Sequence, residues 1–310
     1  MSAPTGTYIT TAAIGNREDL TDMITRITPT ETPFMSMIGK SKATNTLHEW
    51  QTQDLASPAA NAQAEGDDAT AKTITPTVRL NNRTQISTKT VIVSGSQQAA
   101  NSAGRKDEMG YQLTLASLEL RKDMELGLTQ NAVSATSPRQ SRGLIGWIVD
   151  NVDAATAGTA YVPASYTANT AQTDGTQIAF TEARMKNAIQ KCYTAGGHPT
   201  TVMLPPLAKQ TFSTFTGNST RFDKGEDAKL FASVDVYVSD FGELKAVPNR
   251  VQRTRDVFLL QPDKWAMAYY RPFSQKPLSE SGDSEKRMLV VEYTLECRAP
   301  KANAACYDNL

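Results

Sequence analysis

The sequence predicts an α+β fold organised around one long helix and several extended strands. Three segments carry this prediction: an amphipathic helix over residues 106–131, a two-stranded finger with a polar tip over residues 47–94, and a long alternating strand over residues 289–298. At about 1.5 Å per residue, such a helix spans roughly 40 Å, which exceeds the diameter of a small domain. The helix is therefore predicted to act as a structural spine.

Length and composition exclude several classes of protein. With 310 residues, the chain favours one elaborate domain or two interleaved ones. Hydrophobic residues make up 39%, which allows a folded core, and Lys plus Arg (32) balance Asp plus Glu (32), so the chain has no net charge with which to condense DNA by itself. No window approaches the roughly 18 apolar residues of a membrane span, and no membrane partner is expected. Three cysteines and no apolar leader favour synthesis in a reducing cytoplasm.

The first 46 residues are predicted to form an arm. Asn16 can cap a short amphipathic helix over residues 17–28, and Pro29 and Pro33 end it. A small apolar cluster follows, and it must be buried either on its own domain or on a neighbouring subunit. The cluster consists of Phe34, Met35, Met37 and Ile38.

The finger follows the arm. Residues 48–52 have the composition of a strand, residues 56–71 are small and polar, and residues 77–94 are rich in Thr, Val and Ile, which predicts one long strand or a pair of strands. Two-stranded fingers are marginally stable alone in water. A finger of this length is therefore expected to lie on another chain.

The spine helix carries two apolar stripes. Its main stripe recurs at steps of three and four residues, and a second, weaker stripe lies beside it. The main stripe contains Met109, Leu113, Ala116, Leu120, Met124 and Leu128, and the second contains Leu115, Leu118 and Leu126.

A smaller α/β unit follows a polar excursion over residues 151–178. Thr181 can cap a helix over residues 182–195 that Gly196 and Gly197 end, and a buried strand over residues 201–204 precedes a helix over residues 206–215.

The last part of the sequence is predicted to be mostly strands. Valines alternate with other residues over 234–239, and strands at 257–260 and 265–270 flank a predicted type I hairpin turn at residues 261–264. In the last strand, Leu289 to Cys297 alternate with polar residues such as Glu292 and Glu296, which predicts a half-buried antiparallel strand.

A search for catalytic chemistry identifies no candidate residue, cofactor site or metal site. The two histidines, His48 and His198, have no metal-ligand spacing, no nucleophile or phosphate-binding motif is present, and the cysteines are expected to be buried small hydrophobes. Arg250, Arg253 and Arg255 are crowded between strands. They are either solvated or internally paired surface residues, or they form inter-subunit ion pairs or contact packaged DNA.

The order of the elements resembles the major capsid protein fold of tailed phages, which encapsulins also use. Local sequences strengthen the likeness to a subfamily similar to that of elongated-head podophages. These are TPFMSMIGK at 32–40, EWQ at 49–51, VSDFG at 238–242, NR at 249–250, DKW at 263–265 and EKRMLVVEYTL at 285–295.

The resemblance implies a domain assignment and a role. It implies an N-terminal arm (1–46), an extended loop (47–94), a peripheral domain with the spine helix (95–150 and 272–310), a polar insertion (151–178) and an axial domain (179–271). Copies would assemble as pentamers and hexamers into an icosahedral, or elongated, shell around double-stranded DNA, which the protein contacts without sequence specificity. Candidate inter-subunit contacts are Phe34, Met37, Ile38, Trp50, Arg250, Arg253 and Arg255.

Further partners follow from the same resemblance. A portal, a separate scaffolding protein and a decoration protein would join the particle, which is assembled in the host bacterial cytoplasm and ends as a virion capsid. The alternatives are an encapsulin-like shell around an enzyme cargo, a tail or baseplate component that forms tubes or rings, and a cytoplasmic hydrolase with an unrecognised site.

Overall fold

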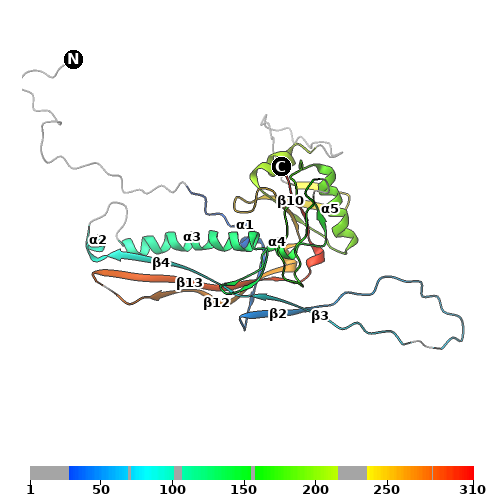
Figure 1. Ribbon diagram of the computed structural model, residues 1–310, viewed down its shortest axis with the longest axis horizontal. Coiled ribbons are helices and arrows are strands. Elements are labelled where there is room, and N and C mark those ends of the chain that lie inside the picture. Colours follow the sequence, from blue (N-terminus) through cyan, green and yellow to red (C-terminus); the bar gives the residue numbers. More distant parts are fainter. Residues whose placement is uncertain (1–27, 69–70, 101–106, 155–157, 216–235, 281) are drawn as a thin grey trace, which may run out of the picture.

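The molecule is elongated, with a long platform, a compact head and a projecting finger (Figure 1). The computed structural model describes residues 28–68, 71–100, 107–154, 158–215, 236–280 and 282–310. The helix expected over residues 17–28, apart from its last residue, and the expected strand residue Val234 lie outside these ranges. Among the short elements are α1 (Pro33–Met37), α2 (Gly95–Ala99), β5 (Ala135–Thr136), β6 (Arg139–Gln140), α4 (Leu144–Trp147) and η2 (Pro300–Ala302).

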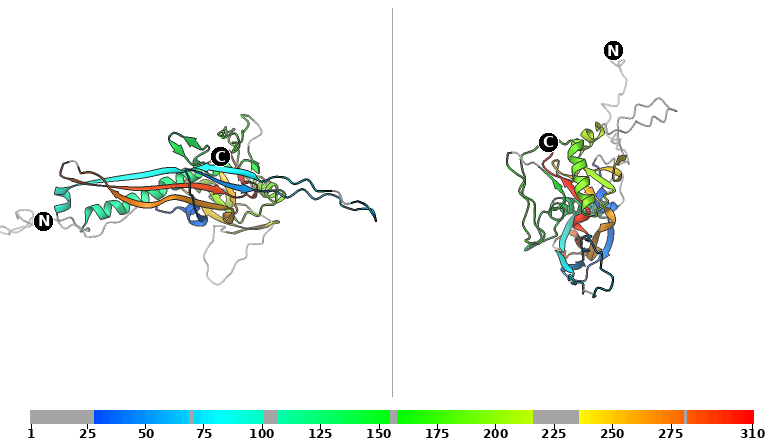
Figure 2. Two further views of the ribbon diagram at one scale, coloured as in Figure 1. Left: turned by 90° about the horizontal axis from the view of Figure 1, so that it is seen from below. Right: turned by 90° about the vertical axis from the view of Figure 1, so that its right-hand side faces the viewer.

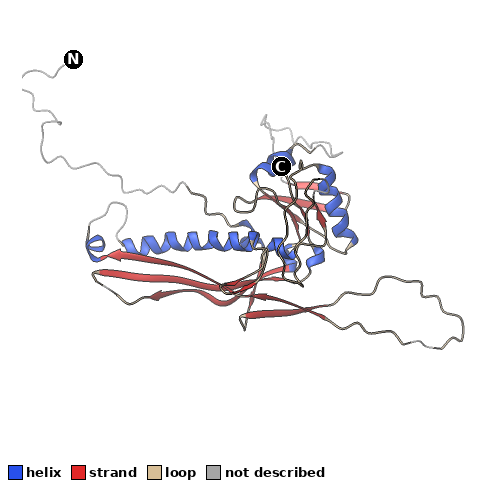
Figure 3. Ribbon diagram, in the orientation of Figure 1, coloured by secondary structure: helices blue, strands red, loops and turns tan. Residues whose placement is uncertain are grey.

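The spine helix is α3 (Glu108–Gln130), which runs along the platform (Figure 3). Its main stripe faces the core, because Met109, Ala116, Leu120, Met124 and Leu128 are all buried. The second predicted stripe does not complete a buried face. Leu115 and Leu118 are half-buried, and the side chain of Leu126 is 46% exposed.

The platform beneath α3 is a four-stranded sheet, and α3 packs against β4 and β13. Strand β1 runs parallel to β12, and the other two pairings are antiparallel. In spatial order the strands are β1 (Gly39–Lys42), β12 (Trp265–Pro277), β13 (Ser284–Cys297) and β4 (Gln85–Ser94). Since β1 is part of this sheet, the end of the predicted arm belongs to the body of the molecule.

Strand β13 is buried on both faces over its second half, and the prediction of a half-buried strand is wrong there. Val291, Tyr293 and Leu295 face the core, and the alternating Glu292 and Glu296 are also covered, at 1% and 7% exposure. The physical reason is that β13 is an inner strand whose second face is covered by side chains of other segments. Arg139 and Arg271 pair with Glu292, and Ser41 and His48 contact Glu296.

The finger consists of β2 (Leu47–Thr52) and β3 (Val78–Arg83), which pair antiparallel. The predicted pair of strands over residues 77–94 is therefore present, but it divides at Thr84, and β4 leaves the finger to pair with β13. Thr84 is buried, and its hydroxyl donates to a carboxylate oxygen of Glu292 at 2.7 Å. This contact fixes the boundary of the finger at residue 83, where the prediction had placed it at residue 94.

The head contains a mixed six-stranded sheet with α5 (Glu182–Thr194) and α6 (Pro206–Ser213) packed against it. Its strands in spatial order are β7 (Val152–Asp153), β14 (Ala304–Cys306), β11 (Val257–Leu260), β8 (Thr201–Leu204), β10 (Gly242–Pro248) and β9 (Val236–Ser239). Strand β14 lies between β7 and β11, so residues 304–310 belong to the head. The assignment of all of residues 272–310 to the platform is corrected accordingly.

The predicted hairpin at residues 261–264 is wrong. A turn is present as η1 (Pro262–Lys264), but β11 belongs to the head sheet and β12 to the platform sheet, so the two strands do not pair. Asn303 holds this crossing. Its side-chain oxygen accepts hydrogen bonds from the backbone N–H of Gln261 at 3.0 Å and from the indole of Trp265 at 2.8 Å.

The predicted start and end of α5 are confirmed, whereas α6 ends at Ser213, two residues before the predicted end at residue 215. The Thr181 hydroxyl accepts from the Arg184 N–H at 3.4 Å, and Gly196 ends the helix region with a φ of +87°. In β9 the alternation runs opposite to hydrophobicity: Tyr237 points inward, whereas Val236 and Val238 are 53% and 66% exposed. No helix in the described ranges is both long and apolar enough to cross a membrane.

Asn82 joins the finger to the platform. Its amide nitrogen donates to the backbone oxygens of Leu295 at 2.8 Å and Arg142 at 3.0 Å, and its oxygen accepts from the N–H of Arg142 at 2.9 Å. The side chain is fully buried. Loss of this amide would leave buried backbone groups without partners, which is costly in a protein interior.

We therefore expect Asn82→Ala to lower the free energy of unfolding of the subunit by about 3 kcal/mol. Asn81 occupies the preceding position of β3 and is exposed, so Asn81→Ala is the matched control. Its free energy of unfolding should stay within about 0.5 kcal/mol of the wild-type value. Urea unfolding monitored by tryptophan fluorescence measures both. Equal effects of the two substitutions would contradict this role of Asn82.

Candidate assembly surfaces

The apolar cluster of residues 34–38, within the predicted arm, packs on its own subunit, which was one of the two alternatives open from the sequence. Phe34 is fully buried and Ile38 is 6% exposed, in the same core as α3 and β13. This corrects the expectation that these two side chains anchor a neighbouring subunit, because their surface is already covered. Met37 is half-buried and keeps an exposed part.

A buried carboxylate explains why α1 sits where it does. Glu125 of α3 accepts hydrogen bonds from the backbone N–H groups of Phe34 at 2.8 Å and Met35 at 2.9 Å, and from the Asn249 amide at 2.8 Å. Burial raises the pKa of Glu125, and these three donors act against the shift. The Glu125 carboxylate thus fixes the start of α1 against the spine helix. In the sequence, this glutamate is one of the charged residues between the apolar positions of the helix.

Trp50 and His48 fix the base of the finger to the body. The Trp50 indole donates to the backbone oxygen of Cys297 at 2.8 Å, and its ring lies 5.4 Å from that of Trp147. The His48 Nε2 lies 3.2 Å from a carboxylate oxygen of Glu296. Trp50 is half-buried within its own subunit, so a Trp50→Ala change would disturb internal packing before it tests assembly.

The three arginines do not share one role. Arg253 and Arg255 form ion pairs within the chain, to Asp174 at 2.5 and 3.3 Å, and Arg255 also pairs with Asp308 at 2.6 Å. This matches the internal pairing that was one alternative from the sequence. It corrects the assignment of Arg253 and Arg255 as contacts to a neighbouring subunit. Arg250 is exposed and borders a small hollow with Lys122 and the prolines at positions 29, 33 and 248.

The finger exposes large apolar side chains. Beyond the paired part of β2 and β3, Leu55 is 94% exposed and Ile74 is 86% exposed, and Val78, which pairs with Thr52, is 59% exposed. Figure 2 shows this part of the chain projecting past the body, at the end opposite α2. The sequence contained a signal for these residues, since Leu55 and Ile74 are isolated large apolar residues in a polar stretch.

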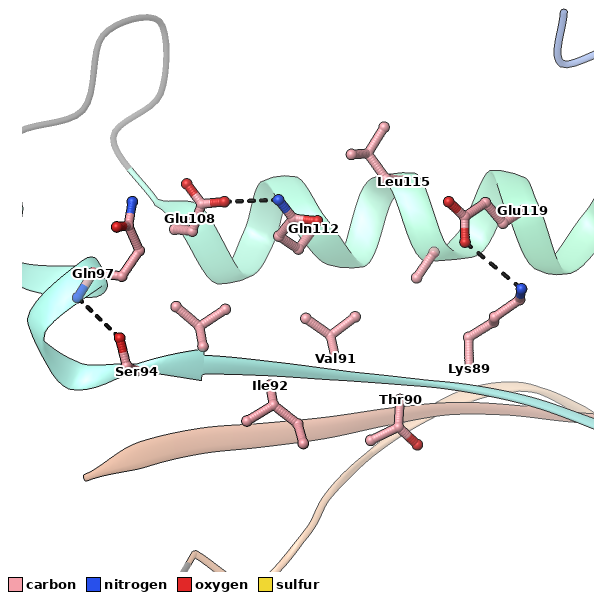
Figure 4. A pocket seen from close by; sticks show the side chains of 12 residues that line it. Lys89, Thr90, Val91, Ile92, Ser94, Gln97, Glu108, Gln112, Leu115 and Glu119 are labelled. Atoms are coloured by element: carbon pink, nitrogen blue, oxygen red, sulfur yellow. Dashed lines mark hydrogen bonds and ion pairs between the residues drawn. The ribbon is translucent and has the colours of Figure 1, made fainter. Parts of the chain in front are cut away.

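A second exposed surface lies on β4, the edge strand of the platform. Ile86 and Ile92 are 44% and 59% exposed and point away from α3, with Thr88 and Thr90 between them. On the opposite side, an open groove of about 580 Å³ separates β4 from the first half of α3 (Figure 4). Lys89 spans this groove with ion pairs to Asp123 at 2.9 Å and Glu119 at 3.7 Å.

The structure places the cysteines and the side chains that could ligate a metal. All three cysteines are buried, and burial raises the pKa of Cys192 to about 11 and that of Cys306 to about 12, so neither thiol is ionised near neutral pH. Within the described ranges, no three His, Cys, Asp or Glu side chains gather closely enough to hold a metal ion.

Comparison with known proteins adds a family. A family model described as SU10 major capsid protein matches residues 4–309. The major capsid protein of Escherichia phage Phieco32 is 26% identical over 336 aligned positions, which cover 94% of each chain.

Solved structures show the same fold. A chain of the capsid asymmetric unit of Cyanophage A-1(L) matches with a TM-score of 0.68 at 14% identity, over 97% of this chain and 98% of that one. A chain of the holo-SrpI encapsulin complex from Synechococcus elongatus PCC 7942 matches with a TM-score of 0.57 at 11% identity, over 95% and 92%. These likenesses confirm the fold class predicted from the order of elements.

The contacts of Glu296 generate a prediction on acid stability. Hydrogen bonds from His48, Arg298 and Ser41 outweigh burial and lower the pKa of Glu296 to about 2. Because an unperturbed glutamate titrates at about 4.5, its stabilising contribution is complete above that pH and is lost as the pH falls towards 2.

We expect the free energy of unfolding of the wild-type subunit to fall more steeply between pH 5 and pH 2.5 than that of Glu296→Gln. Urea unfolding at a series of pH values measures the two slopes. Glu243→Gln, which changes an exposed carboxylate of β10, should retain the wild-type slope. Identical slopes for all three proteins would show that the contacts of Glu296 do not stabilise the fold.

Proposed function

The chain belongs to the SU10 major capsid protein family, and from this premise we propose that its finger and its platform edge provide the contacts by which copies join. As a major capsid protein of a tailed phage, the chain forms the head shell. The exposed residues of the chain suggest which surfaces hold the copies together.

The observation that carries the proposal is the exposure of Leu55 and Ile74 on an extended finger. Burying a side chain of this size stabilises by about 1.5–3 kcal/mol, and a two-stranded finger alone in water has no second layer against which to bury it. The finger would therefore lie on an adjacent subunit, and its base would keep a fixed direction because Trp50 and Asn82 bind it to the body.

The surface that best complements the finger is the outer face of β4 on the adjacent copy. Ile86 and Ile92 offer apolar area, and the threonines between them offer hydroxyl groups to the polar residues of the finger. Met37, Trp50 and Arg250 retain exposed surface and remain candidates for further contacts between copies. The arm before residue 28 would add another contact.

Repetition of these contacts around closed rings would make them sufficient to hold a shell together. The head, which the structure builds without β12 and with β7 and β14, would cluster around the five-fold and six-fold positions in place of the whole of residues 179–271. Closed rings of weak contacts bind strongly together while single errors can still dissociate. A scaffolding protein, a portal, a decoration protein and packaged DNA are proposed partners on the basis of family membership. Assembly would take place in the host cytoplasm.

A double substitution tests the finger. Leu55→Asp combined with Ile74→Asp should leave the subunit folded, because both side chains are exposed, and should reduce the yield of closed shells by at least about tenfold. Ala60→Asp combined with Ala62→Asp adds the same charge to the same loop without removing apolar surface, and should assemble normally. Sedimentation and negative-stain microscopy measure the yield, and normal shells from the first variant would overturn the proposal.

The content of the particle is tested separately. Shells made with candidate scaffold and portal should be larger than a small uniform nanocompartment and should protect double-stranded DNA from nuclease after packaging. Small shells that hold an enzyme cargo and no DNA would support the encapsulin alternative, with which this chain shares its fold.

A further inference from the structure

An excess of buried negative charge lies where the polar insertion meets the head. The segment 161–174 forms a hairpin, with reciprocal backbone hydrogen bonds between Val162 and Thr173 and between Ser165 and Thr170. Asp174 is the only charged residue of this hairpin. It meets two arginines and two further aspartates, and these five residues are called the charge cluster: Asp174, Arg253, Arg255, Asp256 and Asp308.

The charge cluster has three carboxylates and two guanidinium groups, and two of the carboxylates take nearly all of the hydrogen bonds. Asp174 accepts from Arg253 at 2.5 Å and from Arg255 at 3.3 Å. Asp308 accepts from Arg255 at 2.6 Å and from the Gly175 N–H at 3.0 Å. One carboxylate is therefore left without a matched cation.

That carboxylate belongs to Asp256. Its residue is fully buried, and neither of its side-chain oxygens has a hydrogen-bond partner within the described structure. Its nearest cation is the Nε of Arg253 at 3.4 Å, a group already engaged with Asp174. An ionised carboxylate that is buried without hydrogen bonds is strongly disfavoured, whereas its protonated form is neutral and tolerated.

We propose that the charge cluster is a proton-operated clasp, which fastens the hairpin of residues 161–174 to the head when Asp256 is protonated and loosens it when Asp256 is ionised. Lifting the hairpin would remove Asp174 and Tyr161, whose ring stacks on Tyr307 at 5.0 Å, and would let water reach Asp256. The tip of the hairpin keeps contacts of its own, because Asn169 donates to the backbone oxygen of Ser134 at 2.7 Å and accepts from the Arg142 guanidinium at 2.7 Å.

The groups that face Asp256 titrate in separate ranges. Burial raises the pKa of Asp256 to about 7, against the effect of Arg253. For Asp174, burial acts upward, but the hydrogen bond and charge of Arg253 outweigh it and the pKa falls below 3.8. Burial raises the pKa of Tyr161 and of Tyr307, so both phenols stay neutral. Arg253, Arg255 and Asp308 complete the charged surroundings.

The direction of the pH dependence of closure follows from these pKa shifts. The closed clasp holds a proton on Asp256 that the open form releases, so closure is favoured at low pH and is weakened as the pH rises towards 7, by at most about tenfold per pH unit. Asp174 has the opposite sign, and its effect is confined to pH values below 3.8. Burial also raises the pKa of Asp150, which is hydrogen-bonded to Tyr166 of the hairpin, so the response that belongs to Asp256 is the part that Asp256→Asn removes.

Hydrogen exchange measured by mass spectrometry on the full chain tests the clasp. The ratio of hairpin opening in the wild type to that in Asp256→Asn, compared at each pH, should rise by at least about tenfold between pH 5 and pH 7 and level off above it. The comparison at equal pH cancels intrinsic exchange. Asp263→Asn, which changes an exposed aspartate of η1, should follow the wild type.

Two results with both proteins would overturn the clasp. One is a ratio of hairpin opening, wild type to Asp256→Asn, that does not change with pH. The other is a rise of the same size in the amides of α3, which would mean global loosening. If Asp256→Asn fails to fold, the wild type alone decides, because hairpin protection that is independent of pH after correction for intrinsic exchange contradicts the proposal.

Discussion

The structure depends on burying the polar face of one strand. Glu292 and Glu296 of β13 are buried, and a buried carboxylate is tolerated only when cations and hydrogen-bond donors surround it. Arg139 and Arg271 each approach Glu292 at 2.7 Å, and His48, Ser41 and Arg298 serve Glu296. Segments that are far apart in the sequence are thereby held in one arrangement, since moving any of them would remove a partner from a buried carboxylate.

This constraint divides the finger into two parts with different physical properties. Its base is specified by Trp50, Asn82 and Thr84, which bind to β13 or to residues next to it. Among the described residues of its outer part, Asp54 pairs with Lys301 of the body at 2.7 Å, whereas Leu55 and Ile74 are exposed. A shell protein benefits from both, because a fixed base aims the contact and an uncommitted surface adapts to slightly different neighbours around five-fold and six-fold rings.

Local signals in the sequence were sufficient for elements whose pattern is self-contained. The periodicity of α3, the Thr181 cap, the Gly196 stop and the apolar run of β8 predicted those elements correctly. The errors arose where a distant segment decides the outcome. Alternation in β13 could not reveal that Arg139 and His48 would cover its polar face, and the turn at residues 261–264 joins two sheets because Asn303 accepts from both sides of it.

The candidate contacts followed the same division. Phe34 and Ile38 were correctly identified as apolar residues that need cover, but the sequence could not show that Glu125 would seat them on their own spine helix. Leu55 and Ile74 carried a readable signal that was overlooked. The charge cluster could not have been foreseen, since its members come from three separated segments and its excess charge appears only when they meet.

The central position of β14 in the head sheet has a consequence for biosynthesis. This strand is among the last described segments to leave the ribosome, yet it separates β7 from β11 and contributes Ala304 and Cys306 to the inner packing of the head. A nascent polypeptide therefore cannot complete the head before residue 306 has emerged, even though α3 and the finger are translated much earlier. Closure of the head sheet therefore needs contacts between distant parts of the sequence, and contacts of this kind form more slowly than the local contacts of α3.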